Sequence, residues 1–124
     1  MADVTGVEPT PEPNATGVDA LEDAVRVIGG HAKATNLARA HHLADVVADA
    51  DSGELLGQGN RGRVAEIAHQ IAGSAGTFGF PRASRLAAEI EHLFLRGELD
   101  PTHLEIVRGH VLALLADLKG EPTY

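Results

Sequence analysis

One histidine of this 124-residue chain stands in surroundings that suit chemistry with a large partner. At about 100° per helical residue, His69 points roughly 140° away from Val64, which belongs to an apolar helix face. The residues three or four positions away, and one turn further, are all small; they are Ala65, Ala72, Gly73 and Gly76. Glycine inside a helix costs about 1 kcal/mol relative to alanine. Two glycines beside one exposed imidazole therefore predict that something large approaches that imidazole.

The residues that follow this histidine resemble the signature of histidine-containing phosphotransfer (Hpt) domains, His-x-Leu-Lys-Gly-Ser-x-x-x-x-Gly. The matching positions are His69, Ile71, Gly73, Ser74 and Gly79. The segment 81–91 also resembles the family's next helix, and the likeness covers about residues 31–119. One position departs from the pattern, because the family's lysine, three residues after the histidine, is Ala72 here.

The resemblance implies a stoichiometric phosphocarrier rather than an enzyme. A neutral imidazole is a good nucleophile, and by the resemblance Nε2 of His69 is expected to take a phosphoryl group from the aspartyl phosphate of a response-regulator receiver domain and to pass it to another receiver. The receiver is expected to supply Mg²⁺, and this chain to need no cofactor and no metal of its own. A hybrid sensor kinase is a further partner that the family implies. The residues expected to dock the partner are Ala65, Glu66, Gln70, Ala72, Gly73 and Gly76.

The phosphoryl group brings about two negative charges, which Ala72 cannot offset. Arg82 and Arg85 lie early in the next helix, after a tight turn, and are therefore candidate charge partners. Two alternatives stay open at this point. The arginines are ordinary surface residues, or the partner protein supplies the compensating charge.

The sequence also suggests two other functions, an enzyme with a di-metal site and a regulator that carries no phosphate. Glu66-x-x-His69 and Glu89-x-x-His92 repeat a motif of di-metal carboxylate bundles. All four side chains are expected opposite the apolar stripes of their helices, whereas such ligands must point into the core, so no metal site is predicted. The second alternative is a degenerate Hpt-like bundle that docks on a receiver or kinase and regulates it without carrying phosphate. Ala72 favours that alternative, and the retained histidine and glycines oppose it.

Composition limits the classes of function further. The formal net charge is −8 and only four residues are aromatic, which disfavours nucleic-acid binding through phosphate contacts or base stacking. The absence of cysteine excludes disulfides and thiolate metal sites. No apolar run approaches the roughly 18 residues that a membrane span requires. We therefore expect a cytoplasmic, monomeric protein with no membrane or nucleic-acid partner.

Helical spacing of apolar residues predicts an all-α fold, an antiparallel four-helix bundle with a short additional N-terminal helix. A tail over residues 1–17 is expected to be disordered, because Pro9, Pro11 and Pro13 and few large apolar residues cannot form a core. The bundle is expected over residues 18–120, followed by a short C-terminal tail at 121–124.

The expected helix boundaries rest on a few residues with clear start or stop preferences. Gly29 and Gly30 are expected to separate a short helix over 18–28 from a second one over 31–50. Asn60 is expected to cap the third helix and Gly79 to end it. Pro81 is expected in the first turn of the fourth helix. Asp100-Pro101 is expected to start the fifth helix and Lys119-Gly120 to end it.

Overall fold

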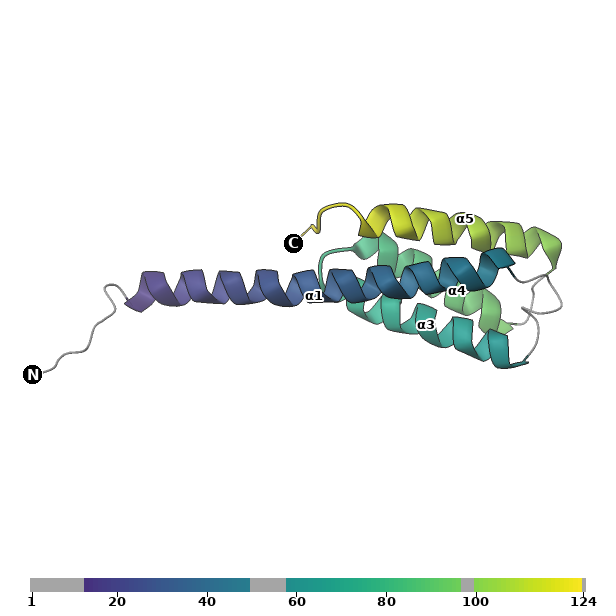
Figure 1. Cartoon of the computed structure of the whole chain (residues 1–124), viewed down its shortest axis with the longest axis horizontal. Coiled ribbons are helices and arrows are strands. Elements are labelled where there is room, and N and C mark those ends of the chain that lie inside the picture. The colour runs from purple at the N-terminus through teal and green to yellow at the C-terminus, as the bar shows by residue number, and fades with distance from the viewer. Residues whose placement is uncertain (1–12, 50–57, 97–99, 124) are drawn as a thin grey trace, which may run out of the picture. The chain divides into compact units, whose positions relative to one another are not determined.

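The computed structural model describes residues 13–49, 58–96 and 100–123, and all its regular elements are helices (Figure 1). They are α1 (Pro13–Asp49), α3 (Gln58–Thr77), α4 (Pro81–Arg96) and α5 (Pro101–Leu118). The part of the chain that the structure describes contains no strand. The prediction of an all-α fold is confirmed.

The chain divides into two compact units, Met1–His31 and Ala32–Tyr124. In the first unit, the described residues from Pro13 onward are helical. The second unit contains the rest of α1 together with α3, α4 and α5, and it holds the histidine and the glycines singled out above.

Neighbouring helices of the second unit run antiparallel. Side-chain hydrogen bonds and ion pairs join residues whose numbers rise along one helix as they fall along its neighbour. These pairs are Arg61 with Phe94 and Ala72 with Ser84 between α3 and α4, Ala83 with Asp117 and Glu89 with His110 between α4 and α5, and Val47 with Arg108 and Lys33 with Gly120 between α1 and α5 with the residues that follow it. This pattern is that of an antiparallel four-helix bundle.

The core of the bundle is built from aliphatic side chains and only two phenylalanines. Leu43, Ile71, Ile90 and Phe94 are among its largest fully buried members. Alanine occupies many of the remaining buried positions; these are Ala40, Ala65, Ala68, Ala75, Ala83 and Ala87. Small side chains allow helix axes to approach closely, which suits a core with few aromatic residues.

The turn between α3 and α4 is formed by a left-handed glycine. Gly79 has φ of 94°, a conformation that L-residues with a side chain rarely adopt. The Phe80 amide then donates to the Ala75 carbonyl at 2.8 Å, the six-residue bond of a Schellman motif. From the C-terminal segment, the Thr123 amide donates to the Gly79 carbonyl at 2.7 Å. The predicted stop at Gly79 is confirmed, and Thr123 of the expected C-terminal tail is hydrogen-bonded to this turn.

Two aspartates cap the helices that follow. The Asp100 carboxylate accepts the His103 amide at 2.9 Å, with Pro101 at the first helical position, as predicted for the start of α5. That backbone hydrogen bond, helped by one from the His103 side chain, lowers the pKa of Asp100. The second cap comes from another helix, because Asp117 of α5 accepts the Ala83 amide in the first turn of α4 at 3.0 Å.

Three predicted boundaries are wrong. Gly29 and Gly30 do not separate two helices, since α1 continues through them. Neither takes the positive φ of a helix-ending glycine, which among the described residues only Gly79 has. A mid-helix glycine costs only about 1 kcal/mol, which by itself does not end a helix. The other two wrong boundaries are helix starts.

Helix α1 begins at Pro13 rather than at residue 18, because proline fits the first turn of a helix, where its missing N–H would lack a partner anyway. Helix α3 begins at Gln58, so Asn60 lies inside the helix instead of capping it. A side-chain cap contributes only about 1 kcal/mol and can be overruled. Residues 1–12 of the expected tail, and residue 124, lie outside the described part of the chain. In the described part, no helix is both long enough and apolar enough to cross a membrane.

Two glycine-to-alanine changes are expected to shift stability in opposite directions. At Gly79 a Cβ would meet the Pro122 Cβ at 2.7 Å and force alanine into the left-handed region, so we expect a loss of at least about 1 kcal/mol. At Gly109, inside α5, a Cβ meets nothing within 4 Å, so Gly109→Ala should gain about 0.5–1 kcal/mol. Urea denaturation of both variants measures this, and equal effects would contradict the described turn.

Candidate functional site

His69 lies in α3 with 73% of its side chain exposed. Its neighbours Ala68 and Ile71 are fully buried in the core, so the imidazole occupies the opposite face of the same helix. The prediction that this histidine is exposed near the middle of the third helix is confirmed. An exposed ring on this face is accessible to a protein partner.

One nitrogen of the ring is held by a glutamate of the next helix. The Nδ1 atom of His69 lies 3.0 Å from Oε2 and 3.2 Å from Oε1 of Glu91, whose side chain is 23% exposed. A carboxylate only accepts hydrogen bonds, so this contact favours the tautomer that carries its proton on Nδ1. The lone pair of the neutral ring is then on Nε2, the nitrogen that the glutamate does not contact.

Glu91 was not among the residues predicted from the sequence. The feature that would indicate Glu91 is the register of two antiparallel helices joined by a tight turn. In that register Ala72 lies opposite Ser84, and residues further from the turn pair with partners further away in the sequence. That register places Glu91 opposite His69. Since hydrophobic periodicity reports the buried face and not the pairing of exposed positions, it could not reveal this contact.

The two glycines near His69 have different surroundings. At Gly73 an added Cβ would meet nothing within 4 Å, so this position is open surface, as predicted. At Gly76 a Cβ would lie 3.1 Å from Ser84 Oγ. The same hydroxyl donates to the Ala72 carbonyl at 2.6 Å. The absence of a side chain at Gly76 therefore serves the close approach of α4, in addition to any effect on a partner.

Ser74, a residue of the motif, has a structural partner on α1. The buried Asn36 side chain, 1% exposed, donates from Nδ2 to Ser74 Oγ at 3.1 Å. Its carbonyl oxygen accepts from Arg39 Nη1 at 3.3 Å, so both ends of the buried amide are satisfied. This network fixes the rear of α3 against α1, behind the face that carries the histidine.

A shallow hollow lies beside the imidazole. It is lined by Gly62, Ala65, Glu66, His69, Glu91 and Leu95. Among the residues predicted to dock a partner, Glu66, Gln70 and Gly73 are exposed, whereas Ala65 is only 5% exposed and Ala72 is half-buried. Leu95 was not predicted, yet it is 66% exposed at the edge of this hollow and offers a partner apolar contact.

The candidate charge partners Arg82 and Arg85 are exposed on α4. They line a different hollow together with Leu86 and Glu89, and this hollow shares no lining residue with the one beside His69. The described residues that line the hollow of the histidine include two carboxylates, Glu66 and Glu91, and no lysine or arginine.

The two Glu-x-x-His motifs do not converge. Glu89 lies 3.4 Å from His110 of α5, and His92 is hydrogen-bonded to Arg96 on its own helix. Glu91, rather than a member of either motif, contacts His69. Among the side chains that the structure describes, no three histidine or acidic residues are grouped so that they could hold a metal ion.

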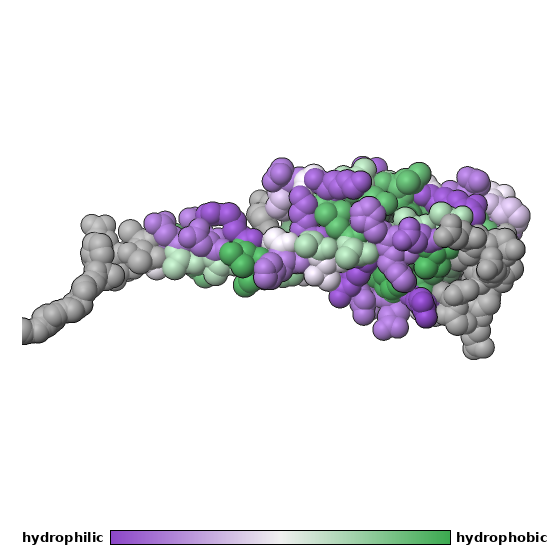
Figure 2. All heavy atoms as spheres, viewed as in Figure 1, coloured by the Kyte–Doolittle hydropathy of each residue, from purple (hydrophilic) through white to green (hydrophobic). Residues whose placement is uncertain are grey.

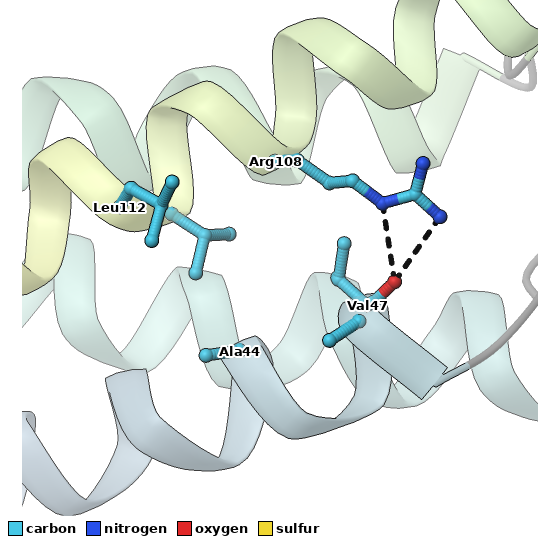
Figure 3. Close-up of a pocket in the computed structure, with 6 residues that line it drawn as sticks. Ala44, Val47, Arg108 and Leu112 are labelled. Atoms are coloured by element: carbon cyan, nitrogen blue, oxygen red, sulfur yellow. Dashed lines mark hydrogen bonds between the residues drawn. The ribbon is translucent and has the colours of Figure 1, made fainter.

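A further hollow, between α1 and α5, is almost entirely apolar (Figure 3). Ala44 and Val47 of α1 face Leu112 of α5 across it, while Arg108 reaches over to donate two hydrogen bonds of 3.4 Å to the Val47 carbonyl. It contains no nucleophile and no acid or base, so the surface of α3 around His69 is the better candidate for chemistry.

One comparison with known proteins gives a match. A family model described as Hpt domain matches residues 18–121 of the chain. No curated protein and no solved structure matches. Hpt domains carry phosphoryl groups rather than catalyse reactions, and they interact with response-regulator receiver domains of two-component systems. Since the match spans most of its length, the chain belongs to the Hpt domain family and takes part in phosphorelay signalling.

Proposed function

We propose that His69 is the phosphorylated residue, taking a phosphoryl group from the aspartyl phosphate of one receiver domain and passing it to the aspartate of another. The observation that carries this proposal is the arrangement of the imidazole, 73% exposed and with Nδ1 held by Glu91. A phosphocarrier needs an accessible nitrogen with a free lone pair, and Nε2 meets that requirement.

The proposed transfer is a displacement at phosphorus. The Nε2 lone pair of His69 forms a bond to phosphorus as the bond from phosphorus to the aspartyl oxygen breaks, which releases the receiver's carboxylate. The ring gains positive charge during this step, because Nδ1 keeps its proton while Nε2 becomes bonded to phosphorus. The Glu91 carboxylate at 3.0 Å stabilises that charge. The reverse displacement delivers the group to the second receiver.

The remaining charge of the phosphoryl group is offset by the partner in this proposal. Ala72 supplies no cation, and Arg82 and Arg85 line a separate hollow. Mg²⁺ bound by the receiver domain would neutralise the phosphoryl oxygens during transfer. The bundle contributes a rigid nucleophile, an open position at Gly73 and the apolar edge at Leu95 on which the receiver docks.

The alternative is a bundle that binds receiver domains without accepting phosphate. Ala72 in place of the family's lysine favours it, because charge compensation on this chain is reduced. Mixing the protein with a panel of phosphorylated receiver domains distinguishes the two functions. A mass gain of one phosphoryl group supports the carrier, whereas complex formation with no mass gain for any receiver supports the regulator.

His69→Gln should abolish labelling by a phosphorylated receiver and leave the bundle folded. Because the side chain is mostly exposed, the free energy of unfolding should change by less than about 0.5 kcal/mol. Mass spectrometry of the labelled protein and thermal denaturation measure the two effects. His92→Gln, another exposed histidine change, serves as the control. Undiminished labelling of the His69 variant would refute the assignment.

Glu91→Ala should slow transfer by about tenfold, the effect of losing one hydrogen bond of roughly 1.4 kcal/mol to a charged group. The loss also releases the ring from the tautomer with its proton on Nδ1, which ¹⁵N NMR of the histidine detects. Glu89→Ala is a matched control, because Glu89 lies two residues away on the same helix and pairs with His110 instead. Equal rates and tautomer populations in both variants would show that Glu91 does not orient His69.

Gly73→Gln should make the bundle more stable and the carrier less active. Space is free at this position, so stability should rise by a few tenths of a kcal/mol or more through helix propensity. The added side chain would then occupy the surface that the aspartyl phosphate must reach. Thermal denaturation and transfer rates of Gly73→Gln and Gly73→Ala measure this, with an intermediate rate expected for alanine. Unimpaired transfer in the Gln variant would show that the partner does not need this opening.

A further inference from the structure

The candidate charge partners Arg82 and Arg85 differ from most other cations of the chain in having no partner of their own. Both are exposed on α4, and within the described part of the chain neither guanidinium forms a hydrogen bond or an ion pair. By contrast, Arg61 donates to a backbone carbonyl and Arg26 pairs with an acid. The two arginines of α4 are therefore available to bind a negatively charged group from outside the chain.

The hollow that these arginines line carries an excess of positive charge. Its other lining residues are Leu86, which is half-buried, and Glu89. Glu89 lies 3.4 Å from His110 of α5, so its carboxylate already has a partner. This positive surface stands out on a chain whose formal net charge is −8. It is complementary to carboxylates, which arginine binds through paired N–H donors.

The arginines share a helix with Glu91, the residue that contacts His69. Arg85 lies six residues before Glu91 and Arg82 nine, which is about 9 Å and 14 Å along the helix axis. At about 100° per residue both point to other sides of α4 than Glu91, in agreement with their separate hollow. A standard interface covers about 800 Å² of each partner, a patch of about 16 Å radius. A protein docked over His69 thus extends to the level of both arginines.

The partner in the proposed function is acidic where it meets this chain. An aspartyl phosphate carries about two negative charges, and one or two further carboxylates hold Mg²⁺, so the centre of the receiver keeps a net charge of about −1 to −2. Glu66 and Glu91 line the hollow beside His69 and repel such a centre. Attraction then has to come from cations outside that hollow, and the pair on α4 lies within reach of the same interface.

We propose that Arg82 and Arg85 attract the acidic surface of the receiver domain and bind its carboxylates beside α4, without touching the phosphoryl group. This inference rests on the proposed function and assigns the arginines to association rather than to transfer. Charges at the edge of an interface act mainly on the association rate and on its dependence on salt. Compensation of the phosphoryl charge, the role considered from the sequence, would instead act on the transfer step.

Single-turnover transfer from an excess of a phosphorylated receiver distinguishes these two roles, because its concentration dependence separates binding from the maximal rate. At about 0.1 M salt, Arg85→Gln should lower the rate at low receiver concentration by about threefold, and Arg82→Gln/Arg85→Gln by about tenfold. The maximal rate at saturating receiver should stay within about twofold. At about 1 M salt the variants should match the unchanged protein within about twofold, because the Debye length falls to about 3 Å.

Arg108→Gln is the matched control, since it removes the same charge as Arg85→Gln from another part of the bundle. Arg108 lines the apolar hollow between α1 and α5, which shares no residue with the other two hollows. Figure 2 shows hydrophobic surface on α5 at this face of the molecule. The control should change the rate by less than about 1.5-fold, and circular dichroism verifies that each variant is folded. Equal effects of the Arg85 and Arg108 changes, or a lower maximal rate in the α4 variants, overturn the proposal.

Binding of the unphosphorylated receiver to the His69→Gln protein tests docking where no transfer takes place. Without Mg²⁺ the carboxylates of the receiver keep their charge, so Arg82→Gln/Arg85→Gln should weaken binding by about tenfold in fluorescence anisotropy at about 0.1 M salt. Binding that depends on the arginines while no receiver labels the chain refutes the phosphocarrier and retains the docking surface. Transfer to His69 that is independent of both arginines refutes the docking surface and retains the phosphocarrier.

Discussion

The close approach of α3 and α4 is the constraint on which the candidate site depends. Ser84 Oγ donates to the Ala72 carbonyl at 2.6 Å, and Gly76 has no side chain that would separate the two helices there. This contact lies one to two turns from the connecting turn and fixes the register of the pair. The same register brings Glu91 to within hydrogen-bond distance of His69. The orientation of the imidazole thus depends on how α3 and α4 pack, and not only on the position of His69 in α3.

The turn that starts this pairing is held by segments distant in sequence. Thr123 donates to the Gly79 carbonyl, and Asp117 accepts the Ala83 amide in the first turn of α4. Lys33 of α1 donates to the Gly120 carbonyl and lies 6.0 Å from the centre of the Phe80 ring. Such contacts compensate for a core with few aromatic residues, because they satisfy helix ends and polar groups that would otherwise be costly to bury. These contacts hold the end of α3 and the start of α4 together and so support the pairing of the two helices.

Much of this architecture could be predicted from the sequence, and the failures have physical causes. Apolar periodicity indicated the helices of the bundle and the exposed face of His69, and Gly79 and Asp100 marked boundaries that the structure has. Gly29 and Gly30 were misleading. A glycine of this kind ends a helix when its backbone takes a left-handed conformation, and the sequence does not show which conformation a glycine takes. Glu91 and Leu95 were missed because contacts between exposed faces depend on the pairing register, which periodicity does not report. The role of Gly76 was seen only in part for the same reason.

The acidic character of the site bears on how long it would hold a phosphoryl group. Glu66 and Glu91 line the hollow beside His69, and the family's lysine is Ala72 here. In the proposed function, a phosphoryl group with about two negative charges would sit among carboxylates with little compensation from this chain. In that proposal Glu91 stabilises the positive ring through Nδ1, whereas both carboxylates repel the phosphoryl oxygens, which disfavours storage of the group. In the same proposal, Mg²⁺ on a receiver domain would supply the charge compensation that the described residues beside His69 lack, which would favour return of the group to a receiver. A carrier without its lysine is therefore consistent with a relay, in which the intermediate need not be the most stable state.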